Sequence, residues 1–311
     1  QRFVEESSLE LHSFLCNAIA DPLESRLLNL DLRDGLGPDR GGKVPPHSAG
    51  LSSGSWTLKG PPHKWRYCTL APKSSSAPIE AVTPRAANPS ADANLRSLQD
   101  ELFSSPAFRA WLSVVTKLIP MRHSVEARRF RPGLDYTLAT SEEGEARLDV
   151  VLGLTPRIRD PGSDEDTSGE GYYRRPVVTR GWQSAEWGGW ECYMAPHNEE
   201  DDPAVYRSSV HKKKVVKEAP PSPGSSSSSS SGKHANGNGK AGSDEEMDDE
   251  EEEEEEDSTL LTVQPGYNRL LLVLRDEKVM RFVKYVSAAA ESSRWDVCGE
   301  YEVGMLQEEV S

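Results

Sequence analysis

The sequence predicts an α+β fold, in which an antiparallel β-sandwich or barrel has helices packed on one side. The first observation is the stretch 259–303, which contains four apolar segments of strand length separated by polar turns such as Asp276-Glu277-Lys278. The second is that residues 279–286 carry apolar side chains on both faces, as expected for a strand covered on both sides. The third is that apolar residues recur at helical spacing upstream of this stretch, which predicts the helices.

The excess of negative charge lies in one run. The 311 residues have a net charge of −15, and Asp244–Asp257 holds 13 acidic residues. Without this run the net charge is −2, so the rest of the chain is nearly neutral. The overall charge therefore excludes no class of partner.

The four cysteines are spread over separate segments and form no Cys-x-x-Cys pair. This argues against a structural zinc site and a disulfide framework, and it suits a reducing cytosol or nucleus. No apolar window reaches the roughly 20 residues of a membrane helix, and no signal peptide is recognised at the start. Because the first residue is Gln, we expect the chain to be part of a longer gene product.

The first part of the predicted domain, residues 1–31, is expected to form a strand at Ser8–Leu15 and a short helix at Asp21–Leu30. Residues 32–54 are rich in Gly, Pro, Asp and Ser and predict a flexible loop. Trp56–Leu70 is dense in aromatic residues. It is interpreted either as a loop anchored on the core or as a recognition surface.

Residues 55–196 are predicted to form the first part of the sheets. Two helices are expected within 94–118, broken and capped at Ser104-Ser105-Pro106, and loops at 72–93 and 156–181. The strand candidates are Val125–Phe130, Leu134–Ala139, Ala146–Leu154 and Trp182–Pro196. In the last of these, Gly188-Gly189 predicts either a point where two backbones approach closely or a bulge that turns a corner.

The end of the chain contains a long insertion. Residues 197–258 combine a basic cluster, a serine run and the acidic run, a composition that predicts disorder. Strands at 259–303 complete the domain, and 304–311 form a tail.

A search for catalytic motifs finds little. Among the seven histidines only His197-Asn198-Glu199 has the His-x-acid form of an iron site, and it lies where the predicted disorder begins. No phosphate-binding glycine loop and no Gly-x-Ser-x-Gly elbow occur. Arg294 has two interpretations: a guanidinium that clamps a ligand carboxylate, or an edge arginine stacked on Trp295.

Several separate motifs follow one another along the chain in a characteristic order. They are Glu5–Leu11, Trp56–Tyr67, Arg129–Leu138, Trp187–Glu191 and the whole of Thr259–Val303. Taken together they resemble the C-terminal domain of the fungal and animal prolyl 3,4-dihydroxylase family of 2-oxoglutarate and Fe(II)-dependent oxygenases. The resemblance implies a double-stranded β-helix, or jelly roll, related to an N-terminal catalytic domain of the same fold.

The resemblance also implies that this domain has lost its chemistry. Ala139-Thr140-Ser141-Glu142 stands where a catalytic copy has its His-x-Asp, and Phe282-Val283 stands where it has Phe-His. Arg294 is similar to the arginine that holds 2-oxoglutarate, and without metal ligands it is a relic. No catalytic, cofactor or metal residue is therefore expected here. Fe(II), 2-oxoglutarate and ascorbate belong to the catalytic domain, expected upstream of Gln1.

The resulting expectation is a non-catalytic domain that binds partners and regulates a prolyl hydroxylase acting on a small-subunit ribosomal protein. Two alternatives stay open: an oxygenase active in its own right, and an acidic-tract binder of basic proteins. The expected partners are the upstream catalytic domain and proteins of the translation or transcription machinery, in nucleus and cytoplasm, with no nucleic-acid motif and no membrane. The candidate interaction surface comprises Trp56, Trp65, Tyr67, Trp182, Trp187 and Trp190.

Overall fold

The structure is a computed structural model that describes residues 2–71, 89–139, 146–158, 181–183, 185–195, 259–276 and 279–305. These residues belong to one unit that spans 1–196 and 258–311. The insertion predicted at 197–258 lies outside the described residues, as do most of the loops predicted at 72–93 and 156–181 and the end of the tail. The disorder predicted for the insertion therefore stays a prediction.

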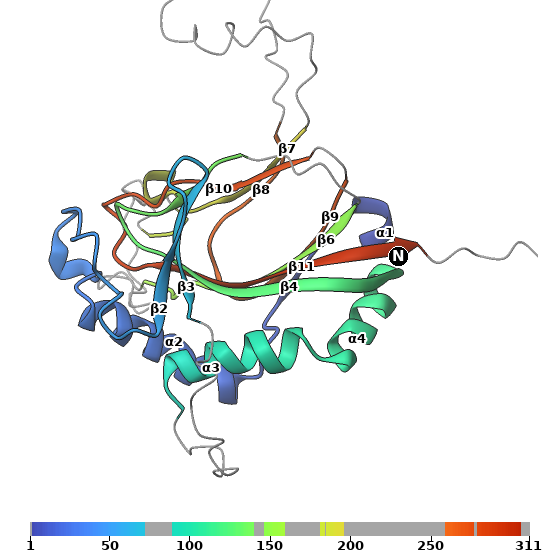
Figure 1. The fold of residues 1–311 in the computed structure, drawn as a ribbon, viewed down its shortest axis with the longest axis horizontal. Coiled ribbons are helices and arrows are strands. Elements are labelled where there is room, and N and C mark those ends of the chain that lie inside the picture. Colours follow the sequence, from blue (N-terminus) through green and yellow to red (C-terminus); the bar gives the residue numbers. More distant parts are fainter. Residues whose placement is uncertain are drawn as a thin grey trace, which may run out of the picture. The chain divides into compact units, whose positions relative to one another are not determined.

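Two antiparallel sheets carry the described strands (Figure 1). The larger sheet has the order β1 (Ser8–His12), β9 (Tyr267–Arg275), β6 (Arg147–Leu154), β11 (Arg294–Met305), β4 (Leu118–Phe130), β3 (Trp65–Leu70) and β2 (Trp56–Lys59). A short strand, β5 (Tyr136–Thr137), pairs with β3. The smaller sheet has the order β10 (Met280–Val283), β7 (Glu191–Met194) and β8 (Thr259–Val263).

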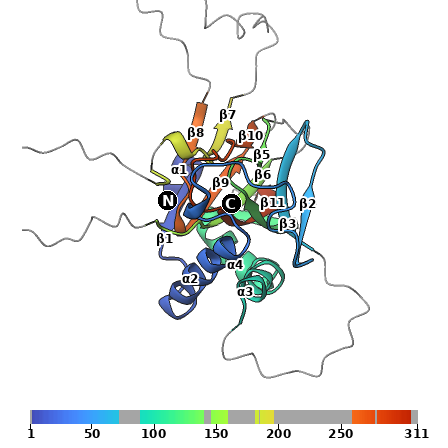
Figure 2. The same cartoon turned by 90° about the vertical axis from the view of Figure 1, so that its left-hand side faces the viewer.

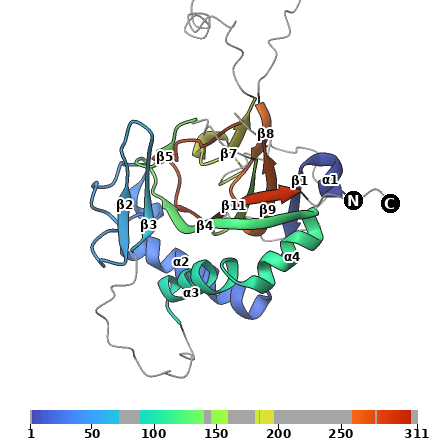
Figure 3. The same cartoon turned by 45° about the vertical axis from the view of Figure 1, so that its right-hand side comes forward.

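The longer helices lie together on one face of the larger sheet, and the smaller sheet lies on the other (Figures 2 and 3). The helical elements are α1 (Arg2–Glu6), α2 (Asn17–Arg33), α3 (Ala91–Ser97), a π-helix η2 (Leu98–Phe103), α4 (Pro106–Thr116) and two short 3-10 turns, Pro38–Arg40 and Ala185–Trp187. No helix among the described residues is long and apolar enough to cross a membrane.

Side chains alternate between the two faces along each strand, so both faces of the larger sheet are packed. On β6, Val150 and Leu152 face the helices and pack in the same core as Leu27 of α2, whereas Val151 faces the smaller sheet and packs with Tyr193 of β7. The α+β prediction is thus confirmed: an antiparallel double-stranded β-helix with helices on one side.

The helix predicted at Asp21–Leu30 begins earlier than expected. Strand-to-helix order is as predicted, but α2 starts at Asn17 rather than at Asp21, so Pro22 lies inside it. Pro22 has no N–H to donate to the preceding turn, which normally weakens a helix. The helix forms nevertheless because a stripe of residues packs on the core: Ala20, Leu23, Leu27 and Leu30 are all buried.

The helix pair is confirmed, with an earlier start than Asn94. The side chain of Ser90 accepts a hydrogen bond from the N–H of Ala93, and that of Ser105 accepts one from Phe108, 3.1 Å each. Ser105 caps α4 at the predicted break. The final four strands are also confirmed, although β10 ends at Val283 rather than Val286.

Two other segments differ from the prediction. Trp56–Leu70 forms the β2–β3 hairpin rather than a loop. Residues 32–54 are irregular apart from the end of α2 and one 3-10 turn, yet arginines bind them to neighbouring segments. Arg40 donates to the carbonyl of Ala288, in the turn before β11, and Arg131, just after β4, donates to those of His47 and Ala49. The strand predicted at Leu134–Ala139 shrinks to the two residues of β5.

Candidate functional site

Charged side chains occupy the space between the two sheets, where a sandwich would normally be apolar. They come from neighbouring strands: four arginines, Arg128, Arg275, Arg281 and Arg294, and four carboxylates, Asp149, Glu191, Asp296 and Glu300. On β11 these residues are spaced by two or four, so they share the face that looks toward the smaller sheet. We call these eight residues the ionic cluster.

Glu191 is at the centre of the ionic cluster. Its Oε1 accepts a hydrogen bond from Nε of Arg281 at 2.7 Å, and its Oε2 accepts one from Arg294 and lies 3.5 Å from Nη2 of Arg128. Burial alone would raise the pKa of this carboxyl group, but the three guanidiniums outweigh burial and hold the pKa well below its usual range. Glu191 is therefore ionised at neutral pH.

The other charges of the ionic cluster are paired in the same way. Arg128 makes a bidentate contact with Asp296, at 2.7 and 3.1 Å. Asp149 lies 3.1 Å from Arg275 and 3.2 Å from Arg281, and burial raises its pKa. Glu300 lies 3.1 Å from Arg281. Burial would raise the pKa of Glu300 too, but Arg281 and Arg275 lower it. Each charge in the ionic cluster thus has a counter-ion.

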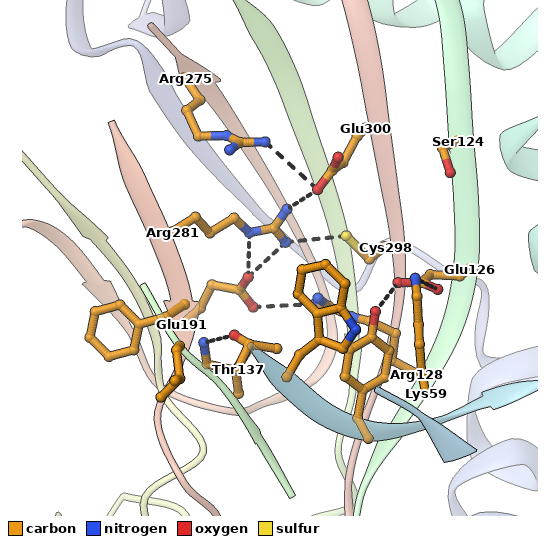
Figure 4. Close-up of a pocket in the computed structure, with 15 residues that line it drawn as sticks. Lys59, Ser124, Glu126, Arg128, Thr137, Glu191, Arg275, Arg281, Cys298 and Glu300 are labelled. Carbon is orange, nitrogen blue, oxygen red and sulfur yellow. Dashed lines mark hydrogen bonds and ion pairs between the residues drawn. The ribbon is translucent and has the colours of Figure 1, made fainter. Parts of the chain in front are cut away.

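A cavity of about 160 Å³ opens beside the ionic cluster (Figure 4). Its lining includes Cys298, whose sulfur accepts a hydrogen bond from Arg281 at 3.2 Å. Burial raises the pKa of the Cys298 thiol to about 12. Elsewhere in the lining, Glu126 accepts hydrogen bonds from Lys59 at 2.8 Å and from Tyr67 at 2.5 Å. The cavity is therefore largely polar, and Trp65, Leu138 and Phe282 add apolar surface to it.

The comparison with protein families decides the assignment. A family described as "Oxoglutarate and iron-dependent oxygenase degradation C-term" matches residues 1–309. The chain belongs to this family.

One curated relative and two solved structures that align with the chain are described as prolyl hydroxylases. The domain is 29% identical to the prolyl 3,4-dihydroxylase OGFOD1 of Ostreococcus tauri over 97% of this chain and 44% of that protein, so it spans less than half of the relative. A prolyl-4-hydroxylase of Pseudomonas putida aligns with 96% of this chain and 94% of its own, with 9% identity and a TM-score of 0.42. A Trichoplax adhaerens prolyl hydroxylase, solved with a hypoxia inducible factor peptide, aligns with 97% and 86%, with 8% identity and a TM-score of 0.43.

The described part of the interior does not fit Fe(II), the metal of the wider oxygenase class. The described histidines, His12, His47, His63 and His123, are all exposed, and the described residues contain no group of three His, Cys, Asp or Glu able to hold a metal. The carboxylates of the ionic cluster already pair with guanidiniums, which would repel a dication. The motif His197-Asn198-Glu199 lies outside the described residues.

Arg294 is buried rather than at an edge, and the prediction that it stacks on Trp295 is wrong. Its guanidinium lies 5.0 Å from the ring centre of Phe130, while Arg129 takes the place over Trp295 at 4.5 Å. Nη2 of Arg294 is shared by Glu191 and Asp296. The cavity beside it, about 30 Å³, has room for a water molecule or two and is too small for a dicarboxylate.

The candidate aromatic surface is largely buried. The exposed fractions are 2% for Trp56, 5% for Tyr67, 5% for Trp182 and 4% for Trp187, so the prediction of a surface is wrong for these four residues. Trp56 packs edge-on against Trp295 in the helix-side core, and Trp182 packs edge-on against Trp187 in a separate apolar cluster. The ring centroids are 5.3 Å apart in both pairs. Trp65 and Trp190 are partly exposed.

Sequence reasoning missed the ionic cluster because a charged residue in a strand normally faces water. A signal was present: Arg294 and Asp296 alternate on one strand, and Arg281 interrupts the apolar face of another. The prediction at Gly188, by contrast, agrees with the structure. This residue has φ +65 and pairs with Val286, and a Cβ there would lie 2.1 Å from the carbonyl oxygen of Tyr285.

Proposed function

We propose that this chain is a non-catalytic domain of a 2-oxoglutarate and Fe(II)-dependent prolyl hydroxylase, and that it serves in partner binding and regulation. The observation that carries this proposal is the ionic cluster. In the space between the two sheets, four arginines and four carboxylates form ion pairs with one another. A ligand there would have to break buried ion pairs, which costs several kcal/mol, about 3–5, for each pair broken.

The parent protein in this proposal resembles the relative named above. A separate catalytic domain would hold Fe(II) and use 2-oxoglutarate and ascorbate, and it would act on a small-subunit ribosomal protein. This domain would then connect the enzyme to proteins of the translation or transcription machinery, in nucleus and cytoplasm. Support comes from the family match and from the similarity to a prolyl 3,4-dihydroxylase of which this chain covers 44%.

Anaerobic titration calorimetry of the full chain tests the non-catalytic assignment. Fe(II) is added first and 2-oxoglutarate second, and a prolyl hydroxylase of known activity serves as the positive control. We expect no saturable heat from either addition. Saturable 2-oxoglutarate binding that depends on Fe(II) would overturn the proposal and favour an oxygenase active in its own right.

A further inference from the structure

Strand β4 has one edge that is only partly paired. Its inner edge pairs with β11 from Leu118 to Phe130, but its outer edge pairs with β3 only at Arg128 and Arg129. Figure 1 shows the reason: the β2–β3 hairpin crosses the end of β4 instead of running alongside it. Among the described strands, none pairs with the remainder of the outer edge.

The exposed backbone groups of this edge can be assigned by alternation. The N–H of Ala127 points away from β11 and donates to the side chain of Gln99 at 2.8 Å, and Arg129 pairs with β3 on the same side. In an antiparallel strand every second residue presents its N–H and C=O to the same edge. His123 and Val125 therefore direct theirs outward, and no strand among the described residues pairs with them there.

The open stretch is short because it is limited at both ends. On one side Gln99 caps Ala127. On the other the register with β11 shifts between His123 and Pro120, and Pro120 has no N–H to donate. Only His123–Val125 is left, enough for a segment of a few residues. A free edge of this kind is a template for strand addition.

The open stretch borders the cavity described above. The side chains of Ser124 and Glu126 line that cavity. A residue paired directly opposite Ser124 on an added strand would point to the same face, and so into the cavity. The charges there are already paired, as in Lys59 with Glu126, whereas Trp65 and Phe282 offer apolar contact. An uncharged side chain with an apolar body fits such a site best, since a charged one would find no free counter-ion.

We infer that the edge of β4 at His123–Val125 binds a short extended segment of a partner protein as an added strand, with one uncharged, apolar-bodied side chain in the cavity. This inference rests on the proposed function and gives its partner binding a location. Recognition then rests mainly on backbone hydrogen bonds. The partner is selected by one side chain and by the capacity of its segment to become extended.

The experiment uses the full chain and a phage-displayed library of random nonapeptides as the probe. Enriched peptides are synthesised with a fluorophore, and their dissociation constants are measured by fluorescence anisotropy. His123→Pro removes the outward N–H without touching the ladder to β11, and His123→Ala is its matched control because it keeps that N–H. We expect His123→Pro to weaken binding about tenfold, as the loss of one hydrogen bond does, and His123→Ala to weaken it less than about twofold.

A second pair of variants tests the cavity independently of the edge. Ser124→Trp fills the cavity and should abolish binding, whereas Ser124→Ala should not, with the melting temperature of each variant as a check on folding. If no peptide is enriched, or if the enriched peptides bind His123→Pro and Ser124→Trp as well as the unchanged chain, the inference is overturned. Either result leaves the Fe(II) titration unaffected, so failure here is distinguishable from failure of the non-catalytic assignment.

Discussion

The guanidinium of Arg281 and the carboxylate of Glu191 lie on neighbouring strands with Nε and Oε1 2.7 Å apart, and both side chains are buried. A buried ion pair adds little net stability compared with a well-packed apolar pair, but breaking it is costly. The pair therefore restricts what the interior can bind. The guanidinium cannot turn to a ligand without leaving Glu191, and Glu191 cannot bind a metal without leaving the guanidinium.

Replacement of Glu191 by Gln should destabilise the domain strongly. The substitution removes the counter-ion that Arg281 and Arg294 share, so we expect the free energy of unfolding in urea to fall by about 3–5 kcal/mol. Glu5→Gln, on the exposed side of α1, is the control and should change it by less than about 0.5 kcal/mol. Equal effects of the two substitutions would contradict the role of Glu191 as a shared counter-ion.

The pH dependence of stability follows from the lowered pKa values of Glu191 and Glu300. A carboxyl group with a lower pKa in the folded state stabilises the fold above its unfolded pKa of about 4.3, and this stabilisation is lost as the pH falls toward the folded pKa. Asp149 acts in the opposite sense, since burial raises its pKa. We expect the free energy of unfolding to decrease between about pH 5 and pH 3, and to decrease less steeply in Glu191→Gln.

Urea unfolding at a series of pH values measures this difference in slope. Because the comparison is between two chains that share every other group, the contribution of Glu191 is isolated. Parallel curves would mean that Glu191 titrates alike in the folded and unfolded states.

A comparison of two glycines with similar φ values separates the cost of backbone strain from the cost of a steric collision. Gly35 has φ +69, and a Cβ at this position would meet nothing within 4 Å, so Gly35→Ala should cost only the left-handed conformation, about 1–2 kcal/mol. Gly188 has φ +65, but its Cβ would meet the Tyr285 carbonyl at 2.1 Å. We expect Gly188→Ala to lower the melting temperature further than Gly35→Ala. Equal shifts would contradict the close approach of the two backbones.

The strands and the helix caps were predictable because local chemistry decides them. Alternating apolar residues determine the strands of 259–303, and Ser105-Pro106 determines the start of α4 whatever surrounds it. The start of α2 was not predictable in this way. Its first turn depends on the contact of Ala20 with the core, which overrides the signal of Asp21-Pro22.

The candidate site was harder to predict because its residues are brought together only by pairing of distant strands. Glu191 and Arg281 are 90 residues apart, and nothing local to either indicates a partner. Arg294 illustrates the same limit. Local pattern places it on a strand, but whether it reaches a ligand, a tryptophan or a carboxylate depends on which strands face it.

Arg129 should not be replaceable by Lys. Its Nη2 donates to Asp31 and its Nη1 to Asp34, both at 2.7 Å, while its plane lies over Trp295. A single ammonium cannot make both contacts and stack as well. We expect Arg129→Lys to destabilise the domain by about 2–4 kcal/mol in urea unfolding, because one buried aspartate loses its charged partner.

The matched control is Arg33→Lys, since the side chain of Arg33 is exposed although it contacts the same Asp34. It should change the free energy of unfolding by less than about 0.5 kcal/mol. An equal and small effect at both positions would refute the two-carboxylate role of Arg129.

Paramagnetic broadening tests whether the ion pairs of the interior leave room for a metal among the carboxylates of the ionic cluster. The full chain is labelled with ¹³C at the carboxyl carbons of Asp and Glu, and Mn²⁺ is added up to one equivalent. We expect the resonances of Glu191, Asp149 and Glu300 to keep their linewidths. Selective broadening of these three signals at substoichiometric Mn²⁺ would contradict it.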